Sequence, residues 1–298
     1  MSAKKRSDNS LRPRRSALYM PGANARALEK ARTLPADCLI LDLEDAVAPE
    51  AKEAARAQIL DALCAGGYGK RELVVRINAL STPWGKGDIA AFAALEEAAR
   101  PHALLAPKIS TPEDIKAVAP LMPKGMDLWI MIETPAAIFN LQALAACSET
   151  GPLTAFCMGT NDLAKETGAA LVEGRAPMQT ALSLTVLAAR QYGLTVLDGV
   201  YIDIPNGDGL AAECRAGADM GFDGKTLIHP SQIETANKVF GPSAEEIEEA
   251  RAIVAAFDDP ANADKGVLTV NGKMTEFLHR DMARRVLAVA HAIEDHNA

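Results

Sequence analysis

The sequence predicts a (β/α)₈ barrel, the TIM-barrel fold, with a C-terminal helical extension. Eight short apolar segments are separated by helix-length stretches, which is the pattern of buried strands alternating with helices. Most of these segments end in a polar or charged residue, and the carboxyl ends of barrel strands meet at one mouth, where active sites lie. The predicted strands are residues 16–20, 38–43, 73–77, 103–106, 128–132, 154–158, 195–201 and 222–228.

Length and composition fit one large core. The chain has 298 residues, of which 49% are hydrophobic, so a single barrel accounts for most of it. No apolar run approaches the roughly 20 residues that span a bilayer. A net charge of −8 gives no reason to expect nucleic acid as a partner. The five cysteines form no CxxC pair, which is typical of a reduced cytoplasmic protein without zinc or disulfides.

Three regions are expected along the chain. Residues 1–13 are basic and lack the apolar stretch of a secretory signal, so they are predicted to be a disordered arm. An alternative is that the last arginines of this segment help to bind an anionic ligand. Residues 14–240 are assigned to the barrel. Residues 241–298 are assigned to an extension that packs on the barrel or on a neighbouring subunit.

The helices and loops follow from end signals in the sequence. A polar loop at 79–88 lies on the predicted functional face, where long loops usually have a purpose. Thr111 is expected to cap a helix that has Pro112 at its first position, and Ser231 to cap the helix after the eighth strand. Helices are predicted at 25–34, 49–63, 136–146, 178–192, 244–257 and 279–294, with an apolar run at 267–270 and a turn or loop at 272–276.

Two carboxylates are expected at neighbouring strand ends. Glu133 follows the strand at 128–132, and Asp162 follows the strand at 154–158. Without a histidine beside them, such a pair suits a hard cation held by oxygen ligands and water, which favours Mg²⁺ over zinc, with Mn²⁺ as an alternative ion. The competing interpretation is that each is a solvated loop carboxylate. We predict that Glu133 and Asp162 are metal ligands.

Arg76 interrupts the apolar run at 73–77, and an arginine in that place needs a partner once it is desolvated. It is predicted to bind a substrate carboxylate or carbonyl in the forked geometry of a guanidinium. The alternative is a structural ion pair with Asp42, Glu44 or Asp45, and the two roles are compatible. These three acids are predicted as outer partners of metal-bound water or of Arg76.

Three further positions at strand ends have open interpretations. Lys108 could form a Schiff base with a carbonyl substrate, but the nearby carboxylates favour a charged, ion-paired lysine. His229 could contact a ligand or cap the turn around Pro230. The segment from Gly159 through Thr160 and Asn161 offers backbone N–H groups at a predicted helix start, and such groups favour a carboxylate or a developing oxyanion.

The same residues carry a resemblance to a known family. The sequence resembles the HpcH/HpaI aldolase or citrate lyase β-subunit-like family over about residues 14–291, with the motifs in the expected order. Within that family it is most similar to malyl-CoA and β-methylmalyl-CoA lyase-like proteins. The motifs are RSALYMPG at 15–22, LILDLEDAV at 39–47, VRIN at 75–78, PK at 107–108, IET at 132–134, GTNDL at 159–163 and LIHP at 227–230.

The resemblance implies roles for individual residues. Glu133 and Asp162 would bind Mg²⁺, Arg76 would contact the oxoacid part of the substrate, and Arg15 is a candidate contact to a CoA phosphate. The C-terminal segment would cover the site of a neighbouring subunit in a homotrimer or homohexamer. Relatives often have an aspartate thought to act as acid and base in that segment, whereas this sequence has Glu276, whose side chain is one methylene longer.

The activity implied by the resemblance is reversible, Mg²⁺-dependent cleavage of a 3-hydroxyacyl-CoA. The substrate would be of the L-malyl-CoA or β-methylmalyl-CoA type, and the products acetyl-CoA or propionyl-CoA and glyoxylate. Alternatives are a citramalyl-CoA lyase that releases pyruvate, a malyl-CoA thioesterase or malate synthase-like enzyme, and a citrate lyase β-subunit acting on a carrier-protein thioester. A barrel that binds CoA esters without catalysis is the alternative from a different class.

Overall fold

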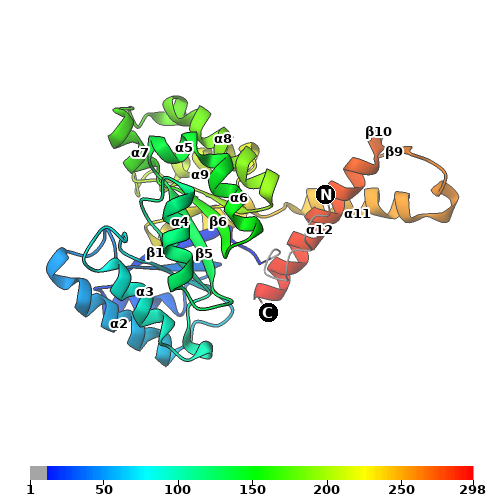
Figure 1. Cartoon of the computed structure of the whole chain (residues 1–298). Coiled ribbons are helices and arrows are strands. Elements are labelled where there is room, and N and C mark those ends of the chain that lie inside the picture. The colour runs from blue at the N-terminus through cyan, green and yellow to red at the C-terminus, as the bar shows by residue number, and fades with distance from the viewer. Residues whose placement is uncertain (1–11, 298) are drawn as a thin grey trace. The chain divides into compact units, whose positions relative to one another are not determined.

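The structure is a computed structural model that describes residues 12–297 (Figure 1). The chain divides into one compact unit at Arg14–Asn237 and a second at Met1–Pro13 together with Lys238–Ala298. The disordered arm is predicted at residues 1–13, and residues 1–11 of it lie outside the described part of the chain. Across residues 12–297, no helix has the length and apolar character needed to cross a membrane.

The first unit is a closed barrel of eight parallel strands, which confirms the predicted fold class. Each strand pairs with the next one in the sequence, and β8 pairs with β1 to close the ring. The strands are β1 Ser16–Pro21, β2 Cys38–Asp42, β3 Glu72–Arg76, β4 Ala103–Ala106, β5 Asp127–Ile132, β6 Leu153–Met158, β7 Thr195–Asp198 and β8 Gly224–Leu227.

Helices connect the strands and surround the barrel (Figure 1). The predicted cap is present at α4, where Thr111 and Asp114 form a reciprocal capping box. The helices are α1 Ala25–Ala31, α2 Lys52–Ala65, α3 Gly85–Ala93, α4 Pro112–Val118, α5 Pro135–Phe139, α6 Leu141–Ala146, α7 Thr160–Thr167, α8 Gln179–Tyr192, α9 Gly207–Met220 and α10 Ile233–Phe240.

Three local predictions within the barrel were wrong. The helix expected at 136–146 is broken at Asn140, whose side-chain amide donates to the carbonyl of Ser110 at 2.9 Å. The loop expected at 79–88 ends early because α3 begins at Gly85. The cap after β8 is His229 rather than Ser231, because the imidazole Nδ1 accepts the backbone N–H of Ser231.

Alternate residues of the strands fill the barrel interior, as the two-residue period of a strand requires. On β2 and β3 the inward positions also include charged residues, with Glu72 at the amino end of β3 and Asp42 and Arg76 at the carboxyl ends. The apolar interior consists of Ala17, Cys38, Ile40, Val74, Ala103, Leu105, Trp129, Met131, Ala155, Cys157 and Leu197, with Tyr19 packed against it.

A buried ion pair closes the amino end of the barrel. Arg14 Nη2 donates to Glu72 Oε1 at 2.7 Å, and Arg14 Nη1 donates to Thr195 Oγ1 at 2.9 Å. The guanidinium carbon of Arg14 also lies 5.3 Å from the ring centroid of Trp129. Arg14 is 5% exposed and Glu72 is 0% exposed, so neither charge is solvated by bulk water and each depends on the other.

The second unit has an antiparallel helix pair and a hairpin. The helices α11 Ala244–Asp258 and α12 Phe277–Asn297 pack together, and β9 Val267–Val270 pairs with β10 Lys273–Glu276. The turn expected at 272–276 is therefore a strand. Asn271 and Gly272 form the connection with φ of 50° and 77°, which is the two-residue hairpin turn favoured by an Asn-Gly sequence.

We predict that Glu72→Gln lowers the stability of the barrel by about 3 kcal/mol, because Arg14 keeps a buried charge without its counter-ion. Urea unfolding followed by circular dichroism measures this difference. Replacing both partners, in Arg14→Met with Glu72→Met, is expected to recover most of the loss, since no charge is then buried. A double variant that is less stable than Glu72→Gln would contradict the assignment.

Candidate active site

Six predicted site residues come together at the carboxyl end of the barrel strands. Asp42 and Arg76 are the last residues of β2 and β3, and they are register partners. Lys108 and Glu133 follow β4 and β5, and Asp162 lies in the first turn of α7, directly after β6. Glu44 follows β2 within two residues of Asp42.

Glu133 is a fully buried carboxylate. Its Oε1 atom accepts the backbone N–H of Lys108 at 2.7 Å. Its Oε2 atom has no hydrogen-bond donor within the described part of the chain. Burial raises the pKa of Glu133 against the opposing effects of the Lys108 backbone and ammonium. A buried carboxylate oxygen without a donor is costly unless a cation or water satisfies it.

Lys108 connects Glu133 to Asp162. Its Nζ atom lies 2.9 Å from Asp162 Oδ1 and 3.4 Å from Glu133 Oε1. Burial lowers the pKa of Lys108, but the two carboxylates outweigh burial and the net pKa is raised, so the amine is charged. The ion-paired lysine expected from the sequence is therefore present, and a neutral Schiff-base nucleophile is disfavoured.

The carboxylates of Glu133 and Asp162 fit a magnesium ion. Both lie within 3.4 Å of one ammonium nitrogen, so a single cation can reach both. Among residues 12–297 no group of three or more His, Cys, Asp or Glu side chains is arranged as a metal cage. Two carboxylates with the remaining positions left to water and substrate oxygens are a common Mg²⁺ arrangement. The orphaned Oε2 of Glu133 supplies the free lone pairs that an additional cation contact needs.

Gly159 allows the backbone before α7 to approach Glu133 closely. A Cβ atom at position 159 would lie 2.5 Å from Glu133 Cβ and 2.8 Å from Glu133 Oε2. Any side chain here would displace the carboxylate. Thr160, which starts α7, is buried, whereas Asn161 is exposed. The first-turn N–H groups of α7 belong to the same mouth as Asp162, as the sequence predicts for Gly159, Thr160 and Asn161.

Arg76 makes the structural ion pair that the sequence offered as one of its two roles. Its Nε and Nη2 atoms donate to the two oxygens of Asp42, both at 2.7 Å. Its Nη1 atom lies 2.7 Å from Glu44 Oε2 and 3.5 Å from Asp45 Oδ2. The aromatic ring of Tyr19 lies 4.7 Å from the guanidinium carbon. A guanidinium has five N–H donors. Asp42 takes two of them and the two on Nη1 face Glu44 and Asp45, so one N–H on Nη2 is left for a ligand carboxylate.

Glu44 is a second buried carboxylate at the mouth. Burial raises its pKa to about 8, with Arg76 opposing the shift and the charges of Asp45 and Glu133 adding to it. Its Oε2 is close to Arg76 Nη1 but makes no hydrogen bond of good geometry. Even without Glu44, the acids Asp42, Asp45, Glu133 and Asp162 outnumber the cations Arg76, Lys108 and Lys52, an arrangement that attracts a divalent ion.

Sequence reasoning missed two supporting residues. Lys52 is buried on α2, and its Nζ atom donates to the carbonyls of Leu43 and Glu44 at 2.8 and 2.6 Å. The same ammonium lies 5.7 Å from the ring centroid of Trp84. The ring of Tyr19 packs against the guanidinium of Arg76. The alternation of β1, in which Ala17 and Tyr19 share the inner face, was a signal for Tyr19; no comparable signal marked Lys52.

Three predicted residues lie outside this cluster. Arg15 lies at the amino end of β1, away from the mouth, and its Nε and Nη2 atoms donate to Asp37 at 2.8 and 2.7 Å. This placement does not fit a phosphate contact at the mouth. His229 has the capping role described above. Glu276 ends β10 in the second unit, where its backbone N–H donates to His279 Nδ1 at 2.9 Å.

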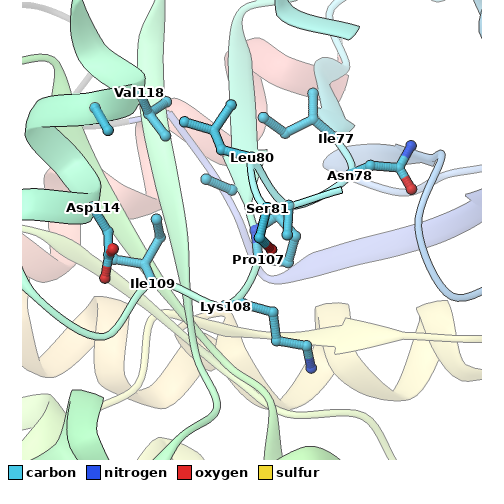
Figure 2. A pocket seen from close by; sticks show the side chains of 12 residues that line it. Ile77, Asn78, Leu80, Ser81, Pro107, Lys108, Ile109, Asp114 and Val118 are labelled. Atoms are coloured by element: carbon cyan, nitrogen blue, oxygen red, sulfur yellow. The ribbon is translucent and has the colours of Figure 1, made fainter. Parts of the chain in front are cut away.

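A cavity of about 200 Å³ lies beside the Pro107–Lys108 segment (Figure 2). It is bounded by the loop after β3, the segment after β4, and α4. Its lining is mostly apolar and includes Ile77, Leu80 and Val118, and the Lys108 side chain extends away from Leu80 and Val118. Asp114 also lines it, but that carboxylate is engaged in the cap of α4.

Comparison with known sequences now identifies the family. Residues 15–230 match the HpcH/HpaI aldolase/citrate lyase family, and residues 179–293 match a family of C–C bond lyases of the TIM-barrel fold. The chain belongs to the HpcH/HpaI aldolase/citrate lyase family. The resemblance seen in the sequence is thereby confirmed.

Relatives in this family include enzymes that act on CoA esters. The (3S)-malyl-CoA thioesterase of Cereibacter sphaeroides is 49% identical, over 94% of this chain and 96% of that protein. Mitochondrial citramalyl-CoA lyase of Homo sapiens is 33% identical, over 95% of this chain and 87% of that protein. The protein CitE from Mycobacterium tuberculosis, crystallised with magnesium, acetoacetate and coenzyme A, is 29% identical with a TM-score of 0.75, over 92% of this chain and 97% of that chain.

We predict that Gly159→Ala weakens Mg²⁺ binding by about 10–100-fold, because the added methyl group displaces the carboxylate of Glu133. Isothermal titration calorimetry with MgCl₂ measures the effect. Gly207→Ala is a matched control, since a Cβ atom there has no neighbour within 4 Å. Equal Mg²⁺ affinity in both variants would show that the close approach at Gly159 has no role in metal binding.

Proposed function

We propose that this protein is a Mg²⁺-dependent carbon–carbon lyase. It reversibly cleaves a 3-hydroxyacyl-CoA of the L-malyl-CoA or β-methylmalyl-CoA type into acetyl-CoA or propionyl-CoA and glyoxylate. The observation that carries this proposal is the convergence of Glu133 and Asp162 on one cation position at the mouth of a barrel of this family. The nearby guanidinium of Arg76 suits the carboxylate of an oxoacid.

The chain's own residues have distinct tasks in this proposal. Glu133 and Asp162 hold the metal, which when bound acts as a Lewis acid toward the oxygens of the malyl group. Arg76 orients the oxoacid carboxylate and is itself held by Asp42. The first-turn amides of α7 favour the negative charge that develops on oxygen. Glu276 moves the proton at the α-carbon of the acyl-CoA, as a positioned carboxylate can.

A second candidate function is hydrolysis of the malyl-CoA thioester to free malate and CoA, either in place of carbon–carbon cleavage or after condensation of acetyl-CoA with glyoxylate. The 49% identity to a (3S)-malyl-CoA thioesterase favours it. A citramalyl-CoA lyase releasing pyruvate is favoured by the 33% identity to the human enzyme. Both use the same site, so the products distinguish them.

Product analysis on a panel of CoA esters tests the proposal. Malyl-CoA, β-methylmalyl-CoA and citramalyl-CoA are incubated with Mg²⁺ while glyoxylate, pyruvate and free CoA are followed separately. We expect oxoacid release that stops with EDTA and falls by at least about 10³-fold in Glu133→Gln and Asp162→Asn. Free CoA without oxoacid would identify a thioesterase, and turnover unaffected by EDTA would refute the metal-dependent mechanism.

The oligomer is part of the proposal because Glu276 belongs to the second unit. We propose a homotrimer or homohexamer in which the residues 241–298 of one subunit cover the mouth of a neighbour. A cluster of exposed apolar side chains near Glu276 supports an interface there, because exposure of contiguous apolar surface to water is unfavourable. They are Val267, Met274, Phe277, Leu278 and Met282, which are 46–66% exposed.

We predict that two inactive variants restore activity when they form mixed oligomers. Glu276→Gln is expected to bind substrate but to lose most of kcat, and Glu133→Gln to lose metal binding. After mild dissociation and reassociation, a mixed oligomer contains some sites with both native residues, so lyase activity returns. Each variant treated alone is the control. Mixed oligomers, verified by mass spectrometry, that stay inactive would contradict a shared site.

A further inference from the structure

Lys108 and a divalent cation require the same oxygen atoms. The Nζ atom of Lys108 lies 2.9 Å from Asp162 Oδ1 and 3.4 Å from Glu133 Oε1, and these are the two residues proposed to hold Mg²⁺. Two cations that share both carboxylates repel each other at this distance. Binding of one therefore weakens binding of the other. This inference rests on the proposed metal site.

The backbone and the side chain of Lys108 act in opposite directions. Its backbone N–H donates to Glu133 Oε1 at 2.7 Å, which holds that carboxylate in place. The residue has φ of 56°, a left-handed conformation that is unfavourable for a side chain other than glycine and often marks a functional position. Replacement of the side chain alone leaves the backbone contact intact, so the two effects can be separated.

The side chain of Lys108 is partly open to solvent. It is 36% exposed, and within residues 12–297 its only ion pairs are with Glu133 and Asp162. An ammonium that leaves these carboxylates stays at the same mouth as Arg76 and has solvent on one side. It can then pair with a negatively charged substrate.

We propose that Lys108 is an internal competitor of the metal and couples metal binding to substrate binding. Its ammonium lowers the affinity of Glu133 and Asp162 for Mg²⁺ when no anion is present. The carboxylate of an oxoacid offers the ammonium another partner and offers the metal further oxygen ligands. Mg²⁺ and the oxoacid consequently bind more tightly together than separately, and Lys108 is a positioning residue for both.

Calorimetric titration of MgCl₂ into the full-length protein tests this role without measuring turnover. We expect Lys108→Met to bind Mg²⁺ about tenfold more tightly than wild type, within the range over which residues next to a metal site alter affinity. Lys108→Arg keeps the charge and is expected to stay near wild type. Lys116→Met removes an exposed lysine paired with Glu113 and is the matched control. Thermal unfolding verifies that each variant is folded.

Addition of pyruvate tests the coupling. In wild type, saturating pyruvate is expected to tighten Mg²⁺ binding, and in Lys108→Met this gain is expected to shrink several-fold. The inference would be overturned if Lys108→Met bound Mg²⁺ no more tightly than wild type does. It would also be overturned if, without pyruvate, Lys108→Arg bound Mg²⁺ as tightly as Lys108→Met does. If wild type binds Mg²⁺ and Glu133→Gln does not, the proposed metal site is supported whatever the result at Lys108. If wild type does not bind Mg²⁺, both the metal site and the role of Lys108 are overturned.

Discussion

A charged side chain that points into a closed barrel has to find its partner inside the same barrel. Asp42 and Arg76 meet this constraint because they are register partners on neighbouring strands and face inward together. Either charge alone would be buried at a cost of several kcal/mol. The ring of Tyr19 and the carboxylate of Glu44 also contact the guanidinium of Arg76. The pair fixes the cation around which Glu44 and Asp45 lie, whereas Lys108 is the cation between Glu133 and Asp162.

The features that could be predicted from the sequence depend on order along the chain. Eight buried runs separated by helices have few solutions other than a closed parallel barrel, since crossovers between parallel strands need helices and right-handed connections. Sequential pairing then makes β5 and β6 neighbours, so the sequence alone predicts that Glu133 and Asp162 lie together. Arg76 is identifiable as a site residue because an arginine within an apolar strand is desolvated and needs a charged partner.

The features that could not be predicted depend on contacts between distant residues or on single backbone angles. Arg15 has the charge of a phosphate ligand, but Asp37 holds it at the opposite end of the barrel. Lys52 reaches the carbonyls of a loop eight and nine residues earlier, which helix periodicity alone does not indicate. The left-handed angle of Lys108 turns its N–H toward Glu133, and propensity disfavours that angle for lysine. The hairpin at Asn271-Gly272, in contrast, follows from a local signal, because an Asn-Gly pair favours a two-residue turn.

The charge pair Arg14–Glu72 lies at the opposite end of the barrel axis from the proposed active site. It lies at the amino ends of the strands, whereas every group proposed to meet substrate or metal from the barrel lies at the carboxyl ends. Between them the interior is filled with apolar side chains. Thermostabilising changes can therefore be concentrated around Arg14, Glu72 and Trp129 without touching the loops of the catalytic face. The usual trade-off between robustness and activity is weakest at this end of the molecule.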